Sequence, residues 1–440
     1  MSASNLNASF PISPYNFKMG KSLRPKFTKL LLLIAFTLSG SLLFAQKAPE
    51  PGNGKMFIPE PDKKATPVEY YASEVFRVGN RHLNWGFHTF NASPFLETYQ
   101  GEGVVVVILD TGIDDHPEFG DRVKYKRDFT DENNTQDQNG HGNHVAGTVA
   151  GENTGFATKA TIGAGKVLES DGYGLTKWGA DGIYWAIDHC GAQVINMSLG
   201  FSSPDIYVED AIAYAMTKSV LIVCANGNQG NDPIKDTGNY PAKYAAKYWN
   251  VIPVGALNHS KLPAQFSSSN HIYGKMTMFA GVNIMSTLPN GKYGEMSGTS
   301  MSSPAVAGIC AGLLSAGYTA REIVELFVSY TVDIDGRYGE GWDTQSGNGY
   351  LDIPAVAENL KRKKEVINPV DTTKTINPID TNKIIEEPQD TLTPPPSNEE
   401  PNTDSKSGGI PWLVWVLLTV TLVVGAGVWF NIQFNKNKTS

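Results

Sequence analysis

The sequence predicts an α/β fold of three layers, with a mostly parallel central sheet and helices on both faces. Strand-like and helix-like segments alternate through the middle of the chain, and 41% of all residues are apolar. This alternation implies right-handed crossovers between parallel strands. The first strand-like segment, residues 104–109, is an unbroken apolar run rich in valine, as expected of a strand buried on both faces.

Further elements follow in order along the chain. The other strand-like segments are 163–168, 193–197, 219–224 and 251–255. The helix-like segments are 142–150, 175–190, 208–217 and 302–316. Sheets of this kind bind their ligands beyond the carboxyl ends of the strands. Polar residues that follow the strands are therefore candidates for a functional site.

The N-terminal region has the features of a secretory signal peptide. Basic residues lie between 21 and 29, an apolar run extends from Leu30 to Ala45, and the small residue Ala45 precedes the expected cleavage site. Residues 1–45 are predicted to be this signal peptide, with Met19 as the true start of translation. The alternative is an uncleaved anchor helix, for which the apolar run is short.

Residues 410–430 are predicted to form a transmembrane helix. They include no charged residue, carry tryptophans toward both ends, and would span about 31 Å as a helix, which matches a bilayer core. The tail 431–440 contains lysines and no acidic residue, which predicts a cytoplasmic C-terminus. The chain is thus expected to cross a cell membrane once, with its body outside the cytoplasm. A buried core helix is the alternative.

Three segments lie between these ends. A short N-terminal extension covers residues 46–83, and the alternating strands and helices fall within residues 84–360. Residues 361–409 are rich in proline, threonine, aspartate and asparagine, a composition that buries too little apolar surface to fold. They are predicted to be a disordered stalk between the body and the membrane.

Charge and cysteine content narrow the range of partners. A formal net charge of −8 argues against nucleic acid. Cys190, Cys224 and Cys310 are an odd number of thiols, two of them in apolar runs, so buried free cysteines are expected. A metal site would need more closely spaced ligands. The prediction is a monomer that requires no cofactor and contacts the membrane through residues 410–430.

Four polar residues follow predicted strands or precede predicted helices. Asp110 ends the first strand, His141 lies between glycines, Asn228 follows a strand, and Ser300 precedes the last helix. Each alone has an ordinary explanation as a turn, capping or packing residue. Their combination makes a different interpretation possible.

Together the four residues supply the groups for nucleophilic acyl transfer. A serine becomes nucleophilic when a base takes its proton, and histidine is the base that titrates near neutrality. A carboxylate fixes the histidine tautomer, while an amide and the N–H of the serine stabilise an oxyanion. The sequence therefore predicts Asp110, His141 and Ser300 as catalytic residues and Asn228 as the oxyanion-hole residue.

The segments around these residues resemble the sequence motifs of the subtilisin family. The matching segments are Val106–Ile113 (VVILDTGI), Asn139–Thr148 (NGHGNHVAGT) and Gly298–Pro304 (GTSMSSP). The order Asp, His, Ser differs from the orders in chymotrypsin-like proteases and α/β-hydrolases. The resemblance covers residues 84–360 and implies a subtilisin-like three-layer fold and serine endopeptidase activity. The short loop after His141 is similar to that of proteinase K-like members.

The resemblance also implies a groove for an extended polypeptide substrate. Two stretches would pair with the substrate main chain and a third would line the main specificity pocket. They are Gly172, Tyr173 and Gly174; Ser198, Leu199 and Gly200; and Ala225, Asn226 and Gly227. Calcium sites are common in the family, but Leu257-Asn258 stand where an acid is often found, so no metal ligand is predicted and calcium stays an alternative.

Two functions from different classes follow. The first is a membrane-tethered serine endopeptidase that acts on extracytoplasmic proteins. The second is a catalytically inactive relative that binds extended peptides without cleaving them. The presence of all four chemical groups favours the enzyme. The extension 46–83 is short for the inhibitory prodomain usual in the family, so either the protein folds without one or a minimal extension lies across the site.

Overall fold

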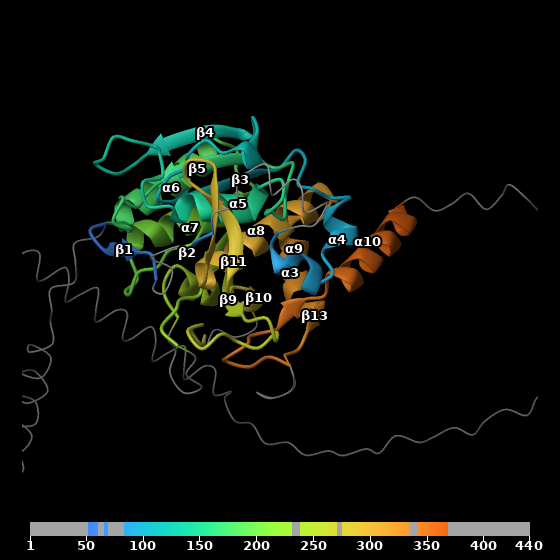
Figure 1. Cartoon of the computed structure of the whole chain (residues 1–440). Helices are drawn as coiled ribbons and strands as arrows, with labels where there is room; N and C mark the ends of the chain where they lie inside the picture. Colours follow the sequence, from blue (N-terminus) through green and yellow to red (C-terminus); the bar gives the residue numbers. More distant parts are fainter. Residues whose placement is uncertain are drawn as a thin grey trace, which may run out of the picture. The chain divides into compact units, whose positions relative to one another are not determined.

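A seven-stranded sheet forms the centre of the fold, and every neighbouring pair of its strands is parallel (Figure 1). In spatial order the strands are β10 (Thr277–Ala280), β9 (Val251–Leu257), β8 (Leu221–Ala225), β7 (Val194–Met197), β3 (Val105–Asp110), β5 (Thr161–Lys166) and β4 (Val123–Asp128). The computed structural model describes residues 52–59, 66–68, 83–230, 238–270, 275–334 and 341–367.

Helices cover both faces of this sheet because successive side chains of a strand point to opposite faces. In β3, Val106 and Ile108 belong to one hydrophobic core, and Val107 and Leu109 belong to the other. The first core includes side chains of α5 (His141–Ala150), α8 (Thr299–Ser315) and α9 (Ala320–Ser329). The second includes side chains of α6 (Thr176–Asp188) and α7 (Ile206–Thr217). The predicted three-layer α/β fold is confirmed.

Smaller elements complete the described part of the chain. The remaining helices are α3 (Trp85–Thr89), α4 (Ser93–Leu96) and α10 (Ile353–Ile367), with 3-10 turns at Pro117–Phe119 and Ala242–Ala246. The smaller sheets pair β1 (Lys55–Phe57) with β6 (Tyr173–Leu175), β12 (Lys292–Met296) with both β11 (Ile284–Leu288) and β2 (Thr66–Val68), and β13 (Thr331–Val332) with β14 (Tyr350–Leu351). Both β1 and β2 come from the short N-terminal extension.

The predicted strands and helices have the expected type and nearly the expected bounds. The sequence reasoning missed both edge strands of the central sheet, β4 and β10, and the helices α3, α4, α9 and α10. The residues of β4 are mostly charged, as is usual at the edge of a sheet. The sequence reasoning also placed the start of the last helix at Ser302, whereas α8 begins at Thr299. Helix α10 continues to Ile367, past the predicted domain boundary at residue 360.

The predicted signal peptide, stalk and transmembrane helix lie almost entirely outside the described residues. Within the described ranges, no helix combines the length and the apolar character needed to cross a bilayer. All three cysteines are buried and free, as expected. Burial raises the pKa of the Cys190 thiol to about 12, so this thiol stays protonated at neutral pH.

Candidate active site

A hydrogen bond joins Asp110 and His141, which are both buried. Asp110 is the last residue of β3 and His141 is the first residue of α5. His141 Nδ1 lies 2.7 Å from Asp110 Oδ1, which also accepts a hydrogen bond from the N–H of Thr111 at 2.8 Å. A carboxylate on Nδ1 selects the tautomer in which Nε2 can take a proton from a nucleophile.

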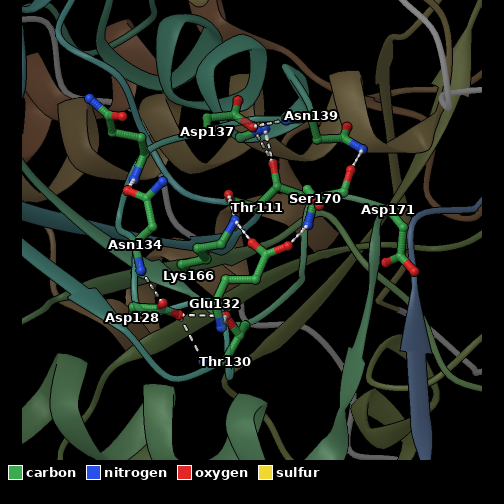
Figure 2. Close-up of polar contacts among 12 residues, drawn as sticks. Thr111, Asp128, Thr130, Glu132, Asn134, Asp137, Asn139, Lys166, Ser170 and Asp171 are labelled. Carbon is green, nitrogen blue, oxygen red and sulfur yellow. Dashed lines mark hydrogen bonds and ion pairs between the residues drawn. The ribbon is translucent and has the colours of Figure 1, made fainter.

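The carboxylate of Asp137 holds the start of α5 against the end of β3 (Figure 2). Its Oδ1 accepts from Thr111 Oγ1 and from the N–H of Gly140, both at 2.8 Å, and its Oδ2 accepts from the N–H of Asn143 at 2.7 Å. Burial raises the pKa of Asp137, partly offset by these donors. Since Thr111 follows the aspartate and Gly140 precedes the histidine, Asp137 helps to fix both members of the pair.

A buried cation lies at the same edge of the sheet. Lys166 ends β5 and is fully buried, and it lies beside Asp110 in the sheet register. Its Nζ donates to the carbonyl oxygen of Thr111 at 2.7 Å and forms an ion pair with Glu132 at 3.0 Å (Figure 2). The sequence reasoning missed Asp137, which lies in a loop, and Lys166, which lies within the predicted strand 163–168, because charged side chains are usually exposed to solvent.

Ser300 lies in the first turn of α8 and is fully buried. Its Oγ donates to the carbonyl oxygen of Ser198 at 3.2 Å. Pro304 lacks the N–H that would bond to the carbonyl of Ser300 within the helix, and Ser198 Oγ donates to that carbonyl at 2.9 Å instead. This substitute bond explains how α8 can start before its proline.

Asn228 lies beside the same helix turn. Its Oδ1 accepts from the N–H of Thr299 at 3.0 Å and from Thr299 Oγ1 at 2.9 Å, which fixes the orientation of the amide. Its Nδ2 donates to the carbonyl oxygen of Pro59 at 3.2 Å. The predicted oxyanion donor therefore faces a peptide carbonyl oxygen next to Ser300.

The packing of three elements brings these residues to one end of the sheet. Helices α5 and α8 pack against each other, and both contact β3. His141 and Ser300 lie in the first turns of these two helices, while Asp110 ends the strand. The four predicted residues thus come from the carboxyl edge of the sheet and the helix starts around it.

The two stretches predicted to flank a substrate pair with a segment of the chain itself. The N–H of Phe57 donates to the carbonyl of Gly200, and the N–H of Gly200 donates back, both at 2.9 Å. On the other side, β1 pairs with β6 in antiparallel orientation, and the N–H of Ile58 donates to the carbonyl of Gly172 at 3.1 Å. Residues 55–59 therefore occupy the predicted groove as an extended chain, and residues 52–59 are here called the inserted segment.

The sequence contained one signal for this segment. Met56, Phe57 and Ile58 form a short apolar run between Lys55 and Pro59, which is typical of a strand. The side chain of Met56 is fully buried. The sequence alone did not say which strands it would join.

The predicted pocket wall is also buried. The amide of Asn226 is held by the carbonyl of Ser268 and by Asn270, both at 2.7 Å, so it serves the architecture of the wall. Gly227 has a φ of 117°, which an L side chain rarely adopts, and its N–H donates to Thr299 Oγ1 at 3.2 Å. The wall is thereby tied to the turn that carries Ser300.

Burial keeps a second histidine of α5, His144, in its neutral form. The pKa of His144 is lowered to about 3, because burial disfavours its charged form. Its Nε2 lies 2.8 Å from the carbonyl oxygen of Ile284, so the neutral ring donates to β11. Among the described residues, no group of three histidine, cysteine or acidic side chains is arranged to hold a metal ion.

Comparison with known proteins gives a consistent result. The Subtilase family model matches residues 101–349. An intracellular serine protease of Paenibacillus polymyxa is 37% identical over 293 residues, covering 62% of this chain and 86% of the relative. Subtilisin E of Bacillus subtilis (strain 168) is 40% identical over 271 residues, covering 59% of this chain and 67% of the relative. Subtilisin BL of Lederbergia lenta is 41% identical over 217 residues, covering 48% of this chain and 76% of the relative. The chain therefore belongs to the subtilase family of serine endopeptidases.

Proposed function

We propose that this protein is a membrane-tethered serine endopeptidase that hydrolyses peptide bonds of extracytoplasmic proteins. The tether is supported by the uncharged segment 410–430, and export by the basic and apolar pattern before residue 45. The lysines of the tail 431–440 favour a cytoplasmic C-terminus. In this proposal the protein is a monomer, and its proteinase K-like character remains a prediction from the loop after His141.

The proposed reaction proceeds through an acyl-enzyme. Ser300 Oγ attacks the carbonyl carbon of the substrate while His141 Nε2 takes its proton, and Asp110 stabilises the imidazolium that forms. Asn228 Nδ2 and the N–H of Ser300 hold the oxyanion of the tetrahedral intermediate. The imidazolium then protonates the leaving amine. Water repeats the sequence on the ester, and this releases the acid and restores the serine.

One observation carries the proposal. The inserted segment crosses the groove as a substrate would, and it presents the carbonyl of Pro59 to Asn228 beside Ser300. This contact supports a groove that accepts an extended main chain in register with the predicted catalytic groups. This arrangement also supports the hypothesis that the minimal extension lies across the site.

Labelling with a fluorophosphonate probe tests the catalytic part of the proposal. We would compare the full-length protein with Met56→Asp, which places a charge in a fully buried position and should displace the inserted segment. If the probe labels Met56→Asp protein but does not label the double variant Met56→Asp/Ser300→Ala, the result would support an activated Ser300. A folded Met56→Asp protein that stays unlabelled and cleaves no peptide in a library would favour the inactive peptide-binding alternative.

Membrane fractionation tests the tether. We expect the full-length protein in the membrane pellet after a carbonate wash, and a variant that ends at residue 409 in the soluble extracytoplasmic fraction. A full-length protein that is washed free, or a truncated protein that remains in the cytoplasm, would contradict this part of the proposal.

A further inference from the structure

We propose that the side chains of Glu132 and Asn139, here called the clamp, are positioning residues that hold the carbonyl oxygen of Gly172 for hydrogen bonding to a substrate. By this means the clamp determines how strongly the groove rejects a polypeptide whose second residue, counted back from the bond to be cleaved, lacks an N–H. Proline is such a residue. The inference rests on the proposed peptidase function for its effect on cleavage, whereas its effect on peptide binding holds for the inactive alternative as well.

The carbonyl of Gly172 is a main-chain acceptor at the edge of the groove. The N–H of Ile58 donates to it at 3.1 Å. Ile58 is the second residue when Pro59, whose carbonyl faces Asn228, is counted as the first. The hydrogen bond that a substrate makes here depends on where the loop before β6 holds the carbonyl of Gly172.

The clamp holds this loop at Ser170, two residues before Gly172. Glu132 Oε1 accepts from the N–H of Ser170 at 2.9 Å, and Asn139 Nδ2 donates to the carbonyl of the same residue at 2.9 Å (Figure 2). Both main-chain polar groups of Ser170 are thus engaged by the clamp. Because the two clamp side chains come from the loop between β4 and α5, they join the edge of the groove to the segment that leads to His141.

The loop needs this attachment when the groove is open. Within the loop, the N–H of Glu169 donates to the carbonyl of Tyr173 at 2.7 Å, and the N–H of Gly172 donates to the carbonyl of Glu169 at 2.9 Å. These bonds close the turn on itself. The strand that follows, β6, pairs with β1, which belongs to the inserted segment. When that segment leaves, the clamp still holds the loop, so an arriving substrate meets a preorganised acceptor.

Lys166 anchors the Glu132 side of the clamp. Its Nζ lies 3.0 Å from the second carboxylate oxygen of Glu132, and it also donates to the carbonyl of Thr111, the residue after Asp110. Burial raises the pKa of Glu132, but the hydrogen bonds from Ser170 and the charge of Lys166 more than offset this, so the pKa is lowered. The acceptor for Ser170 is therefore an ionised carboxylate, which makes a stronger hydrogen bond than a neutral group.

Peptide binding to the Met56→Asp/Ser300→Ala protein tests the clamp without any cleavage. The two probes are acetyl-Lys-Met-Phe-Ile-Ala-amide, which follows residues 55–58 and ends in alanine, and the same peptide with an N-methyl isoleucine. The methyl group removes the N–H that would meet Gly172. We expect it to weaken binding about tenfold in this parent protein, as measured by calorimetry.

The clamp variants are compared with this parent. We expect the penalty of the methyl group to fall to about threefold or less when Asn139→Ala or Glu132→Gln is added. Gln138→Ala is the matched control, because this neighbouring side chain is exposed, and it should keep the full penalty. If circular dichroism shows that Glu132→Gln is unfolded, Asn139→Ala alone decides. Comparing penalties within each protein cancels any other effect of the methyl group.

Steady-state kinetics with Ser300 restored tests the consequence for cleavage, on the 4-nitroanilides of the same two peptides. The clamp variants should raise KM for the N–H substrate and leave kcat nearly unchanged, as expected for lost uniform binding. The N-methyl substrate should be affected much less. The control Gln138→Ala should treat both substrates as the parent does.

Three results overturn the clamp. They are a parent protein that shows no penalty, a penalty that is unchanged in the folded clamp variants or equally reduced in Gln138→Ala, and a loss of kcat/KM that is equal for both substrates. The last result would mean that Asn139 and Glu132 act on the catalytic groups or on the fold. The expected binding results without cleavage by any of the proteins would support the clamp and contradict the peptidase function.

Discussion

The carbonyl oxygen of Pro59 lies 3.2 Å from Asn228 Nδ2, while Thr299 holds the oxygen of the same amide. The amide has two tasks, because it organises the first turn of α8 through one atom and faces a substrate-like carbonyl through the other. A substitution that separates these tasks can show which of them catalysis needs.

We predict that Asn228→Asp and Asn228→Ala both lower kcat by about 10²–10³-fold in the Met56→Asp background, with little change in KM. This is the loss known for one oxyanion donor in a subtilisin. Aspartate keeps the acceptor for Thr299, so it should retain the thermal stability that alanine loses. Steady-state kinetics on a peptide substrate and thermal unfolding measure the two effects. A kcat within about threefold of the parent would contradict the predicted role.

We predict that Pro59→Ala converts the inserted segment into a substrate. In the antiparallel register, the hydrogen-bonded pair that follows Phe57–Gly200 joins residue 59 to Ser198. An N–H on residue 59 would therefore donate to the carbonyl of Ser198. Proline has no N–H, and Ser300 Oγ donates to that carbonyl instead. Alanine should return the hydroxyl to the histidine and allow cleavage after residue 59.

Mass spectrometry of the N-terminus checks this outcome. Purified Pro59→Ala should begin at Glu60, and the same substitution combined with Ser300→Ala should keep residues 52–59. The prediction would be contradicted if Pro59→Ala protein kept residues 52–59 although the fluorophosphonate probe labelled its Ser300. That result would show that the missing N–H of Pro59 is not what protects the peptide bond after residue 59.

We predict that Glu132→Ala destabilises the fold by about 3 kcal/mol. Its carboxylate pairs with Lys166, whose side chain is fully buried, and the loss of one partner leaves a buried charge poorly compensated. The Lys126–Asp115 pair is the matched control, because Asp115 is almost fully exposed and such surface pairs contribute about 0–1 kcal/mol. Urea unfolding of Glu132→Ala and Asp115→Ala measures both values, and equal values would reject the prediction.

Local sequence predicted the parts of this molecule that depend on local chemistry. The apolar run of β3 predicts a buried strand from residue type alone, and the motifs around Asp110, His141 and Ser300 were recognised by their resemblance to a known family. The network of Asp137 and Lys166 could not be predicted in this way. Both carry charged side chains, which are usually exposed, and only the approach of β5 to β3 and the turn before α5 makes them buried partners of the site.

The inserted segment shows a second limit of local sequence. Its apolar residues indicate a strand, but its position depends on pairing with β6 and with Gly200, which lie more than a hundred residues away in the chain. Short strands contain too little information to specify such partners. The hydrogen bond from the N–H of Gly52 to Asp205 depends on the same long-range register.

We predict that protonation of His144 destabilises the fold as the pH falls. The pKa of this group is about 3 in the folded protein and about 6.5 in an unfolded chain. Between these values the unfolded chain binds a proton that the folded protein does not. The contribution of neutral His144 to the free energy of unfolding is therefore fully present above about pH 6.5. It decreases toward pH 3 by about 1.4 kcal/mol per pH unit.

His144→Gln isolates this contribution, because a glutamine amide can still donate to the carbonyl of Ile284 and does not titrate. Unfolding free energies from urea titrations at pH 7, 6, 5 and 4.5 would be compared for the two proteins. Other groups, including the buried His116 with its own lowered pKa, affect both proteins equally. Below pH 6, the unfolding free energy of His144→Gln should fall less steeply with decreasing pH, by the equivalent of about one bound proton. Parallel slopes would mean that His144 is protonated in the folded protein, in disagreement with its burial.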